Sequence, residues 1–399
     1  MTTMERMRRW NGPALFSYGF RPFFFFAAVY AAVAVLIWTL WLDGVSGLPT
    51  TFPPVAWHAH ELLFGYASAV VAGFLLTAVP NWTGRLPVVG WPLVALFCLW
   101  LLGRAAMAAS GALGALPLAV LTLAFPVALA VLIAREVLAG RNVRNVKVVA
   151  VLAALCLAQV CFHVEVSRAG VATYSERLAL AAYLMLVMIV GGRIVPSFTT
   201  NWIKRENPGR LPIPFGRFDK IAMIVAGAAL AVWVGLPAFA RAAPLATLLF
   251  LAAAVLHVVR LARWAPDRVW AEKLVAVLHV AYAFIPLGFA VAAAGAMTND
   301  SVFDIAAIHA WAIGAIGLMT LAVMTRATRG HTGHALIAPP STSLLYLFLV
   351  VAAVARIAAA FLDNPAPALT VAGFAWSAGF AGFALFYGPM CIASRRQSA

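Results

Sequence analysis

Charged residues are scarce in this chain of 399 residues. Asp, Glu, Lys and Arg make up 10% of it, whereas hydrophobic residues make up 64%. A soluble domain carries about a quarter of its residues as charged side chains. Because so few polar side chains cannot cover a water-soluble globule, the composition excludes an ordinary soluble enzyme.

Cysteine is scarce as well. None of the four cysteines belongs to a CxxC pair, and all of them lie inside hydrophobic runs: Cys98, Cys156, Cys161 and Cys391. Cysteines in such runs usually act as small buried side chains. The sequence therefore predicts neither a disulfide framework nor a cysteine-bound zinc ion.

Long hydrophobic runs are what the chain does have. Short polar or Gly/Pro-rich gaps separate runs of about 20 to 25 residues, the helix length that crosses roughly 30 Å of hydrocarbon. The sequence predicts an all-α, polytopic membrane helix bundle. About twelve transmembrane helices are expected near residues 19–42, 57–80, 88–110, 113–138, 146–167, 174–196, 217–241, 243–263, 270–296, 303–326, 341–361 and 366–392.

The basic residues indicate the topology. The chain has 28 Lys and Arg against 13 Asp and Glu, and the basic ones cluster in alternate loops that begin at Arg6, Arg85, Arg135, Lys204, Arg260, Arg326 and Arg395. The positive-inside rule therefore predicts cytoplasmic N and C termini, and this placement argues against a nucleic-acid partner. The first hydrophobic block is too long for a signal peptide, so we expect it to be retained.

The whole chain, residues 1–399, is expected to form one transmembrane domain. A six-plus-six division of the helices stays open, because no sequence repeat supports it. The sequence leaves the oligomeric state open as well.

Histidines dominate the ionisable residues expected inside the bilayer, where such groups are costly and often functional. His58 and His60 open the second predicted helix, and His163 and His309 lie near the outer ends of the fifth and tenth. These four imidazoles share one depth. Because imidazole is the usual ligand for haem iron and for copper, this layer predicts a cofactor or metal site.

The spacing of His58 and His60 allows two interpretations. If the segment is helical, the two side chains point about 200° apart and could face two different centres. If Pro53 and Pro54 keep it extended, that argument fails. A membrane histidine can also simply hydrogen-bond a neighbouring helix.

Two further histidine pairs lie elsewhere. His257 and His279 are expected at comparable depth in the inner halves of adjacent helices, where they form a second candidate cofactor site. His331 and His334 follow the tenth predicted helix. They are candidate metal ligands, or they belong to a solvated loop.

Carboxylates and arginines accompany the histidines. Glu61 and Glu165 are candidate catalytic residues, because either could orient an imidazole or relay protons. Alternatively, Glu61 is a first-turn charge favoured by the helix dipole, and Glu165 lies in the headgroup region. The arginines within spans could hold haem propionates or reach the interface instead: Arg21, Arg104, Arg193 and Arg356.

Six segments of the chain resemble the bacterial NnrS family. They are Ser17–Phe24 (SYGFRPFF), Trp57–Glu61 (WHAHE), Gly73–Gly84 (GFLLTAVPNWTG), Gly191–Asn201 (GGRIVPSFTTN), His309–Gly317 (HAWAIGAIG) and Met324–His334 (MTRATRGHTGH). The resemblance implies a twelve-helix protein of the bacterial inner membrane that contains haem b and copper. The histidines that match the family's pattern are His58, His60, His163, His309, His331 and His334.

The resemblance also implies nitric oxide as the small-molecule partner, in denitrification or nitrosative-stress protection. The leading hypothesis is binding of nitric oxide at an outer metal centre and its reduction to nitrous oxide, with quinol as candidate electron donor through a haem at His257 and His279. A sensor or scavenger would need the same ligands but no turnover. A secondary transporter is a further alternative, although the histidine layer lies near one face and no acidic midplane site is evident.

Overall fold

The computed structural model describes residues 10–45, 47–238 and 243–393, which fold as helices without a β-strand. Twelve helices are long and apolar enough to cross a membrane, which confirms the predicted all-α polytopic architecture. The predicted basic clusters at Arg6 and Arg395 lie outside the described residues. The cytoplasmic location of the termini stays a prediction.

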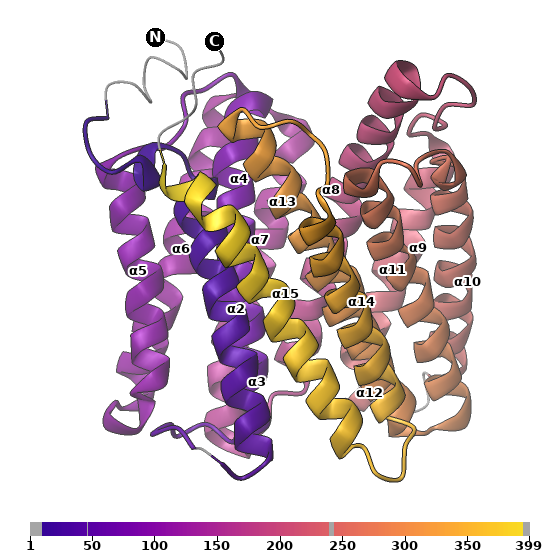
Figure 1. The fold of residues 1–399 in the computed structure, drawn as a ribbon. Helices are drawn as coiled ribbons and strands as arrows, with labels where there is room; N and C mark the ends of the chain where they lie inside the picture. The colour runs from indigo at the N-terminus through magenta and orange to yellow at the C-terminus, as the bar shows by residue number, and fades with distance from the viewer. Residues whose placement is uncertain (1–9, 46, 239–242, 394–399) are drawn as a thin grey trace. The chain divides into compact units, whose positions relative to one another are not determined.

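Each membrane-crossing segment is one helix or a run of helical pieces (Figure 1). Their bounds are α2 (Phe20–Leu42), α3 (Pro54–His60), η2 (Glu61–Ala67), α4 (Ser68–Thr83), α5 (Trp91–Ala108), α6 (Ala115–Ala139), α7 (Val146–Ala169), α8 (Tyr174–Glu206), α9 (Arg217–Gly235), α10 (Ala243–Ala262), α11 (Lys273–Thr298), α12 (Ser301–His309), η8 (Ala310–Gly317), α13 (Leu318–Thr332), α14 (Pro340–Ala359) and α15 (Ala366–Ile392). The pieces α3–η2–α4 form one span, and α12–η8–α13 form another.

Two helices continue well beyond their predicted ends. The sequence predicts a helix over 174–196, but α8 reaches Glu206; likewise 303–326 is extended to Thr332 by α13. Hydropathy detects only the apolar part of a helix, whereas backbone hydrogen bonding continues through polar turns. Pro208 follows the end of α8, and Gly333 adopts a left-handed conformation (φ 81°) after α13, so both helices end at residues that disfavour continuation.

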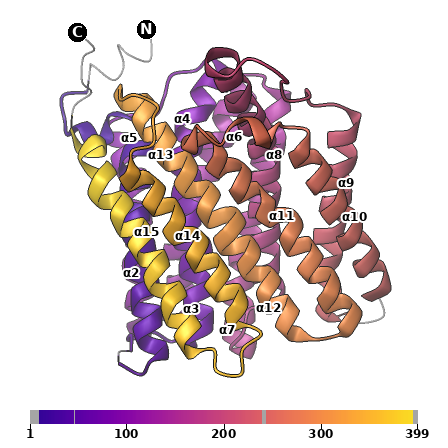
Figure 2. The ribbon, with the colours of Figure 1, turned by 45° about the vertical axis from the view of Figure 1, so that its right-hand side comes forward.

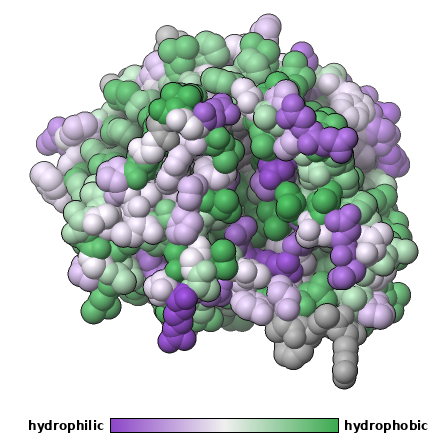
Figure 3. All heavy atoms as spheres, turned by 90° about the horizontal axis from the view of Figure 1, so that it is seen from below, coloured by the Kyte–Doolittle hydropathy of each residue, from purple (hydrophilic) through white to green (hydrophobic). Residues whose placement is uncertain are grey.

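The surface is largely apolar, as a lipid environment requires. Val131 in α6, Ile224 in α9, Leu248 in α10 and Leu385 in α15 are each 64–71% exposed. Figure 3, a view onto the ends of the helices, shows hydrophilic residues mixed with hydrophobic ones there. Exposed apolar side chains in such numbers are incompatible with water and natural in a bilayer.

The chain forms two compact units. The first unit consists of Met1–Ala179, Ala327–Ala335 and Phe380–Ala399, and the second of Leu180–Arg326 and Leu336–Gly379. Helices α8, α13 and α15 contribute residues to both units, so no single linker divides the chain into six plus six helices. The single transmembrane domain stays a prediction.

Neighbouring helices pack directly within each unit. In the first unit α2 packs against α4, and α6 packs against α5 and α7. In the second unit α10 packs between α9 and α11, which run beside it in both ribbon views (Figures 1 and 2).

Two of the spans contain a π-helix, and each π-helix begins directly after a histidine. His60 ends α3 and η2 follows; His309 ends α12 and η8 follows. In both cases a glycine stands five residues after the histidine, Gly65 and Gly314. Because π-helical segments are rare and concentrate at functional sites, they direct attention to these two histidines.

Candidate functional site

The short helix α3 gives His58 and His60 different surroundings. Pro54, with its fixed backbone, occupies the first turn of α3, so the segment is helical as the first interpretation requires. The ring of His58 stacks on Trp38 with 4.6 Å between ring centroids and an interplanar angle of 21°. His60 is fully buried and faces other helices, so the two imidazoles do not share one environment.

Aromatic rings enclose His60. Its ring centroid lies 6.0 Å from that of Phe52, 5.3 Å from Phe64 and 5.4 Å from Phe162. The ring of His163 lies at 5.4 Å as well. The structure therefore brings together two of the predicted imidazoles, from α3 and α7, inside an apolar cage in the first unit.

The carboxylate of Glu61 fixes the tautomer of His60. Oε1 of Glu61 lies 2.6 Å from Nδ1 of His60, and Glu61 also accepts hydrogen bonds from Arg104 Nη1 and the Tyr30 hydroxyl. A carboxylate that accepts from a guanidinium is ionised, so the hydrogen in the His60 contact belongs to Nδ1. The neutral imidazole therefore has an unprotonated Nε2, the nitrogen through which histidine usually binds a metal ion.

Arg104 in α5 is the counter-charge of Glu61. Its side chain is 7% exposed, whereas Glu61 is completely buried. The sequence suggests Arg104 as a haem-propionate ligand, but here its Nη1 donates to Glu61, so the guanidinium already has an anionic partner. A buried pair of this kind is stable only when each charge meets hydrogen-bonding partners, which His60 and Tyr30 supply for Glu61.

Gly65 permits this arrangement. A Cβ atom at position 65 would lie 2.7 Å from Arg104 Nη1 and 2.9 Å from the Tyr30 ring. The carbonyl of Gly65 also accepts a hydrogen bond of 2.9 Å from the Trp100 indole. The π-helix η2 thus presents bare backbone where α2 and α5 insert the two side chains that hold Glu61.

A polar pair completes the site on the side of α6 and α7. Thr122 Oγ1 lies 2.8 Å from Nε2 of His163. Gln159 is 1% exposed; its Nε2 lies 3.2 Å from the Thr122 carbonyl and 3.5 Å from Nε2 of His60. Its Oε1 is buried without a hydrogen-bond partner. The amide of Gln159 lies beside the His60 imidazole, and a bound ion or water would satisfy its orphaned oxygen.

Replacement of Gly65 by alanine is expected to lower the free energy of unfolding by about 1–3 kcal/mol, because the new methyl group forces Arg104 and Tyr30 away from Glu61. The matched control is Gly103→Ala in α5, where the nearest atom to a new Cβ is at 3.5 Å, an ordinary contact. Thermal unfolding in detergent measures both. Equal melting temperatures for the two variants would contradict the close approach at Gly65.

Two predicted residues of the first unit have structural contacts. Glu165 accepts hydrogen bonds at 3.1 Å from the backbone N–H groups of Tyr174 and Ser175, so it stabilises the start of α8. Arg21 donates to the carbonyls of Cys391 and Ala393, at the end of α15. A guanidinium is favourable at a helix C-terminus. The catalytic role of Glu165 and the cofactor role of Arg21 stay predictions.

The two histidines of the GHTGH segment differ from each other. The sequence places both in a loop, but His331 lies in the last turn of α13 and only His334 lies beyond it. The His331 ring contacts Tyr18 and Phe20, with centroids 5.4 and 5.6 Å apart. Burial raises the pKa of the Tyr18 phenol, because the phenolate would lose its hydration. Tyr18 therefore stays protonated beside His331.

His334 has a local partner. Its Nδ1 lies 2.8 Å from the hydroxyl of Thr332, which is 2% exposed. The structure does not bring His331 and His334 into a common group with a third acidic, cysteine or histidine side chain among the described residues. Their metal-binding role stays a prediction.

His257 and His279 lie in the second unit and are joined by aromatic rings. His257 Nδ1 is 2.9 Å from the Tyr282 hydroxyl, whereas His279 Nε2 is 2.8 Å from Thr199 Oγ1. The rings of Trp264 and Tyr282 lie 4.5 Å apart, and the Trp264 ring in turn lies 6.5 Å from that of His279. The predicted pair is therefore connected through an aromatic contact.

A buried ion pair underlies this second cluster. Arg260 is 1% exposed; its Nε donates to Asp219 at 3.1 Å and its Nη1 donates to Tyr282 at 2.7 Å. A Cβ at position 192 would lie 2.2 Å from Arg260, so Gly192 of α8 makes room for the guanidinium. From the sequence, Arg260 is only one of the basic residues that indicate topology. In the structure its side chain contacts α8, α9 and α11 from its place on α10.

The remaining predicted residues also lie in the second unit. His309 is half-buried, and its Nδ1 lies 2.8 Å from the carbonyl of Ile305. A carbonyl can only accept, so the Nδ1 of His309 is the donor in this hydrogen bond. Arg193 in α8 and Arg356 in α14 are both half-buried. Their cofactor roles stay predictions.

Several site residues escape sequence reasoning. Gln159 carries a usable signal, because it stands four residues before His163 in an apolar helix and so lies on the same face. Thr122 and Tyr30 carry none, since each is one of many such residues in hydrophobic runs. No group of three or more His, Cys, Asp or Glu side chains arranged for metal binding occurs in the described part of the chain.

The family model of the NnrS protein matches residues 14–395, nearly the whole chain. The chain belongs to the NnrS family. No curated protein sequence matches it. Membership indicates a multi-pass membrane protein of the nitric oxide response, and the twelve apolar helices agree with that class. The matched region includes every residue of the buried His60–Glu61–Arg104 cluster.

Proposed function

We propose that this NnrS protein binds nitric oxide at a copper ion held by His60 and His163 in the bacterial inner membrane, and reduces it to nitrous oxide. The observation that carries the proposal is the fully buried His60, whose Nδ1 is held by the Glu61 carboxylate and whose ring lies 5.4 Å from that of His163. A carboxylate behind an imidazole is the usual support of a metal-binding histidine.

The donor set fits copper. With metal–nitrogen bonds of about 2.0 Å, two imidazoles on one ion have ring centres roughly 4.5–6 Å apart, a range that includes the separation of His60 and His163. Gln159 lies beside His60, and its Oε1, which is buried without a hydrogen-bond partner, would supply a third ligand atom. Two or three protein ligands would leave a position for a diatomic molecule.

The surroundings of His60 do not fit haem. Three phenylalanine rings have their centroids 5.3–6.0 Å from that of His60, where a macrocycle would need to lie. We therefore propose haem b at His309 instead. Its Nδ1 donates to a backbone carbonyl, so the imidazole would hold the haem iron through Nε2.

The protein residues supply protons and charge balance. Reduction follows 2 NO + 2 e⁻ + 2 H⁺ → N₂O + H₂O, so the site needs proton donors in an apolar cage. The Tyr30 hydroxyl and Arg104 both donate to Glu61, which places an exchangeable proton within one hydrogen bond of the carboxylate beside His60. A bound metal supplies the nitric oxide ligand position and one-electron chemistry. Quinol is the proposed reductant.

Purified protein loaded with copper and haem is the material for the test. We expect consumption of nitric oxide with nitrous oxide as product, in a 2:1 ratio, when a quinol is supplied. Glu61→Gln, loaded to the same copper content as the wild type, should still bind nitric oxide but turn it over roughly 10²–10⁴-fold more slowly, the usual contribution of a positioned proton-transfer group.

A different outcome would favour the alternative. Stoichiometric loss of nitric oxide without nitrous oxide would leave a sensor or scavenger. If the purified protein takes up neither copper nor haem, the proposal is refuted.

A further inference from the structure

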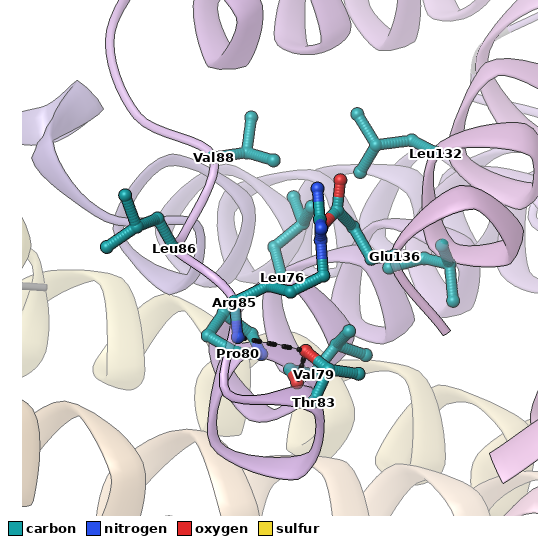
Figure 4. Close-up of a pocket in the computed structure, with 10 residues that line it drawn as sticks. Leu76, Val79, Pro80, Thr83, Arg85, Leu86, Val88, Leu132 and Glu136 are labelled. Carbon is teal, nitrogen blue, oxygen red and sulfur yellow. Dashed lines mark hydrogen bonds and ion pairs between the residues drawn. The ribbon is translucent and has the colours of Figure 1, made fainter. Parts of the chain in front are cut away.

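A small pocket opens in the first unit at the end of α4, on the side predicted to face the cytoplasm (Figure 4). A narrow recess, part of it open to solvent, lies between α4, the loop over 84–90 and α6. Its walls are mainly aliphatic, from Leu76, Val79, Leu86, Val88 and Leu132. The polar part of the pocket is formed by Arg85 and Glu136, which point toward each other in Figure 4.

Cations exceed anions at this pocket. Glu136 accepts hydrogen bonds from both Arg85 and Arg135, so one buried carboxylate serves two guanidinium groups. The Arg85 and Arg135 side chains are 43% and 66% exposed, whereas that of Glu136 is 9% exposed. The pair of arginines thus keeps a net positive charge and presents it outward.

The adjacent loop increases this positive charge. Arg141, Arg144 and Lys147 follow α6, and no acidic residue besides Glu136 occurs between positions 81 and 150. Asn142 donates to the carbonyl of Trp82, so this loop is attached to the end of α4 beside the pocket. Exposed apolar side chains alternate with these cations: Leu138, Val143 and Val146 are 66%, 81% and 43% exposed.

We propose that this pocket binds an anionic phospholipid, with the phosphate on Arg85 and Arg135 and acyl carbon atoms against the aliphatic walls. Cations that alternate with exposed apolar residues, next to an apolar recess, match the chemistry of an anionic lipid at the membrane interface. A neutral amphiphile such as a quinone would need no such excess of positive charge. The lipid would bridge the 84–90 loop to α6 and is independent of the metal centre.

Native mass spectrometry of the full-length protein, titrated with phosphatidylglycerol or phosphatidylcholine, tests the proposal. We expect at least a tenfold preference of the wild type for phosphatidylglycerol. In Arg85→Gln/Arg135→Gln the preference should disappear, since each cation near an anionic headgroup contributes roughly a fivefold increase in affinity. The control Lys204→Gln/Arg205→Gln makes the same charge change at the end of α8, where Arg205 also pairs with Glu206; it should keep the preference.

Glu136→Gln distinguishes lipid binding from a merely structural ion pair. Removal of the carboxylate leaves both arginines for the phosphate, so affinity for phosphatidylglycerol should rise severalfold even if the variant melts earlier. Loss of affinity in this variant, or equal binding of the two lipids to the wild type, would overturn the proposal. Displacement of the lipid by inorganic phosphate alone, or by an equimolar neutral short-chain quinone, would overturn it too.

Discussion

His60→Ala is expected to eliminate copper binding by the purified protein. The imidazole is completely buried, its Nδ1 is held by Glu61 and its unprotonated Nε2 faces Gln159. Loss of a partner behind a metal ligand already weakens affinity by about 10–100-fold, so loss of the ligand itself should exceed 100-fold. Elemental analysis after dialysis, together with a competition titration against a copper chelator, measures the effect.

His58→Ala is the matched control. It stands two residues away on the same short helix, but its ring stacks on Trp38 and does not face His163. This variant should therefore retain copper, whereas His163→Ala should lose it as His60→Ala does. Full copper content in His60→Ala would refute the assignment. Loss of copper from His58→Ala alone would mean that the metal site lies on the other face of α3.

Arg104→Leu is expected to be the most destabilising substitution in the first unit. It leaves the carboxyl of Glu61 fully buried without its cation, and removal of one partner from a buried pair costs about 3–5 kcal/mol of unfolding free energy. Thermal or denaturant unfolding in detergent, monitored by circular dichroism, should show a large decrease in stability and a low yield of purified protein.

The double variant Glu61→Gln/Arg104→Leu supplies the control. Without the carboxylate there is no uncompensated charge, so the double variant should be more stable than Arg104→Leu alone. Additive losses from the two substitutions would mean that Arg104 stabilises the fold through its aliphatic packing and not through Glu61.

The membrane architecture could be predicted from the sequence because length and apolarity alone decide whether a helix can cross a bilayer. The same reasoning could not find the ends of α8 and α13. Their last turns contain Lys204, Arg205 and Arg329, which hydropathy excludes although helical hydrogen bonding includes them. What ends these helices is Pro208 and the left-handed Gly333, two local signals that hydropathy does not measure.

The site was predictable in part, because buried charged groups are rare enough to be conspicuous in a hydrophobic sequence. His60, Glu61, His163 and Arg104 are all predicted, and the structure brings them together. The partner of Arg104 was not predictable, since Glu61 in η2 and Arg104 in α5 are 43 residues apart and only packing determines which groups meet.

The π-helices were also beyond sequence reasoning. Nothing in the composition of Glu61–Ala67 or Ala310–Gly317 separates these segments from ordinary α-helix. Their common feature, a histidine followed by a glycine five residues later, becomes meaningful only after both backbones are known.

The wide helical turn of η2 affects which sequence changes this span can accept during evolution. One additional residue in the π-helix η2 rotates the preceding helix α3 by about 100° relative to α4. The part of the span after η2, Ser68–Thr83, can therefore keep its packing contacts when the part that ends at His60 changes. Substitutions or a shifted insertion could therefore alter the chemistry around His60 while the packing of α4 stays unchanged.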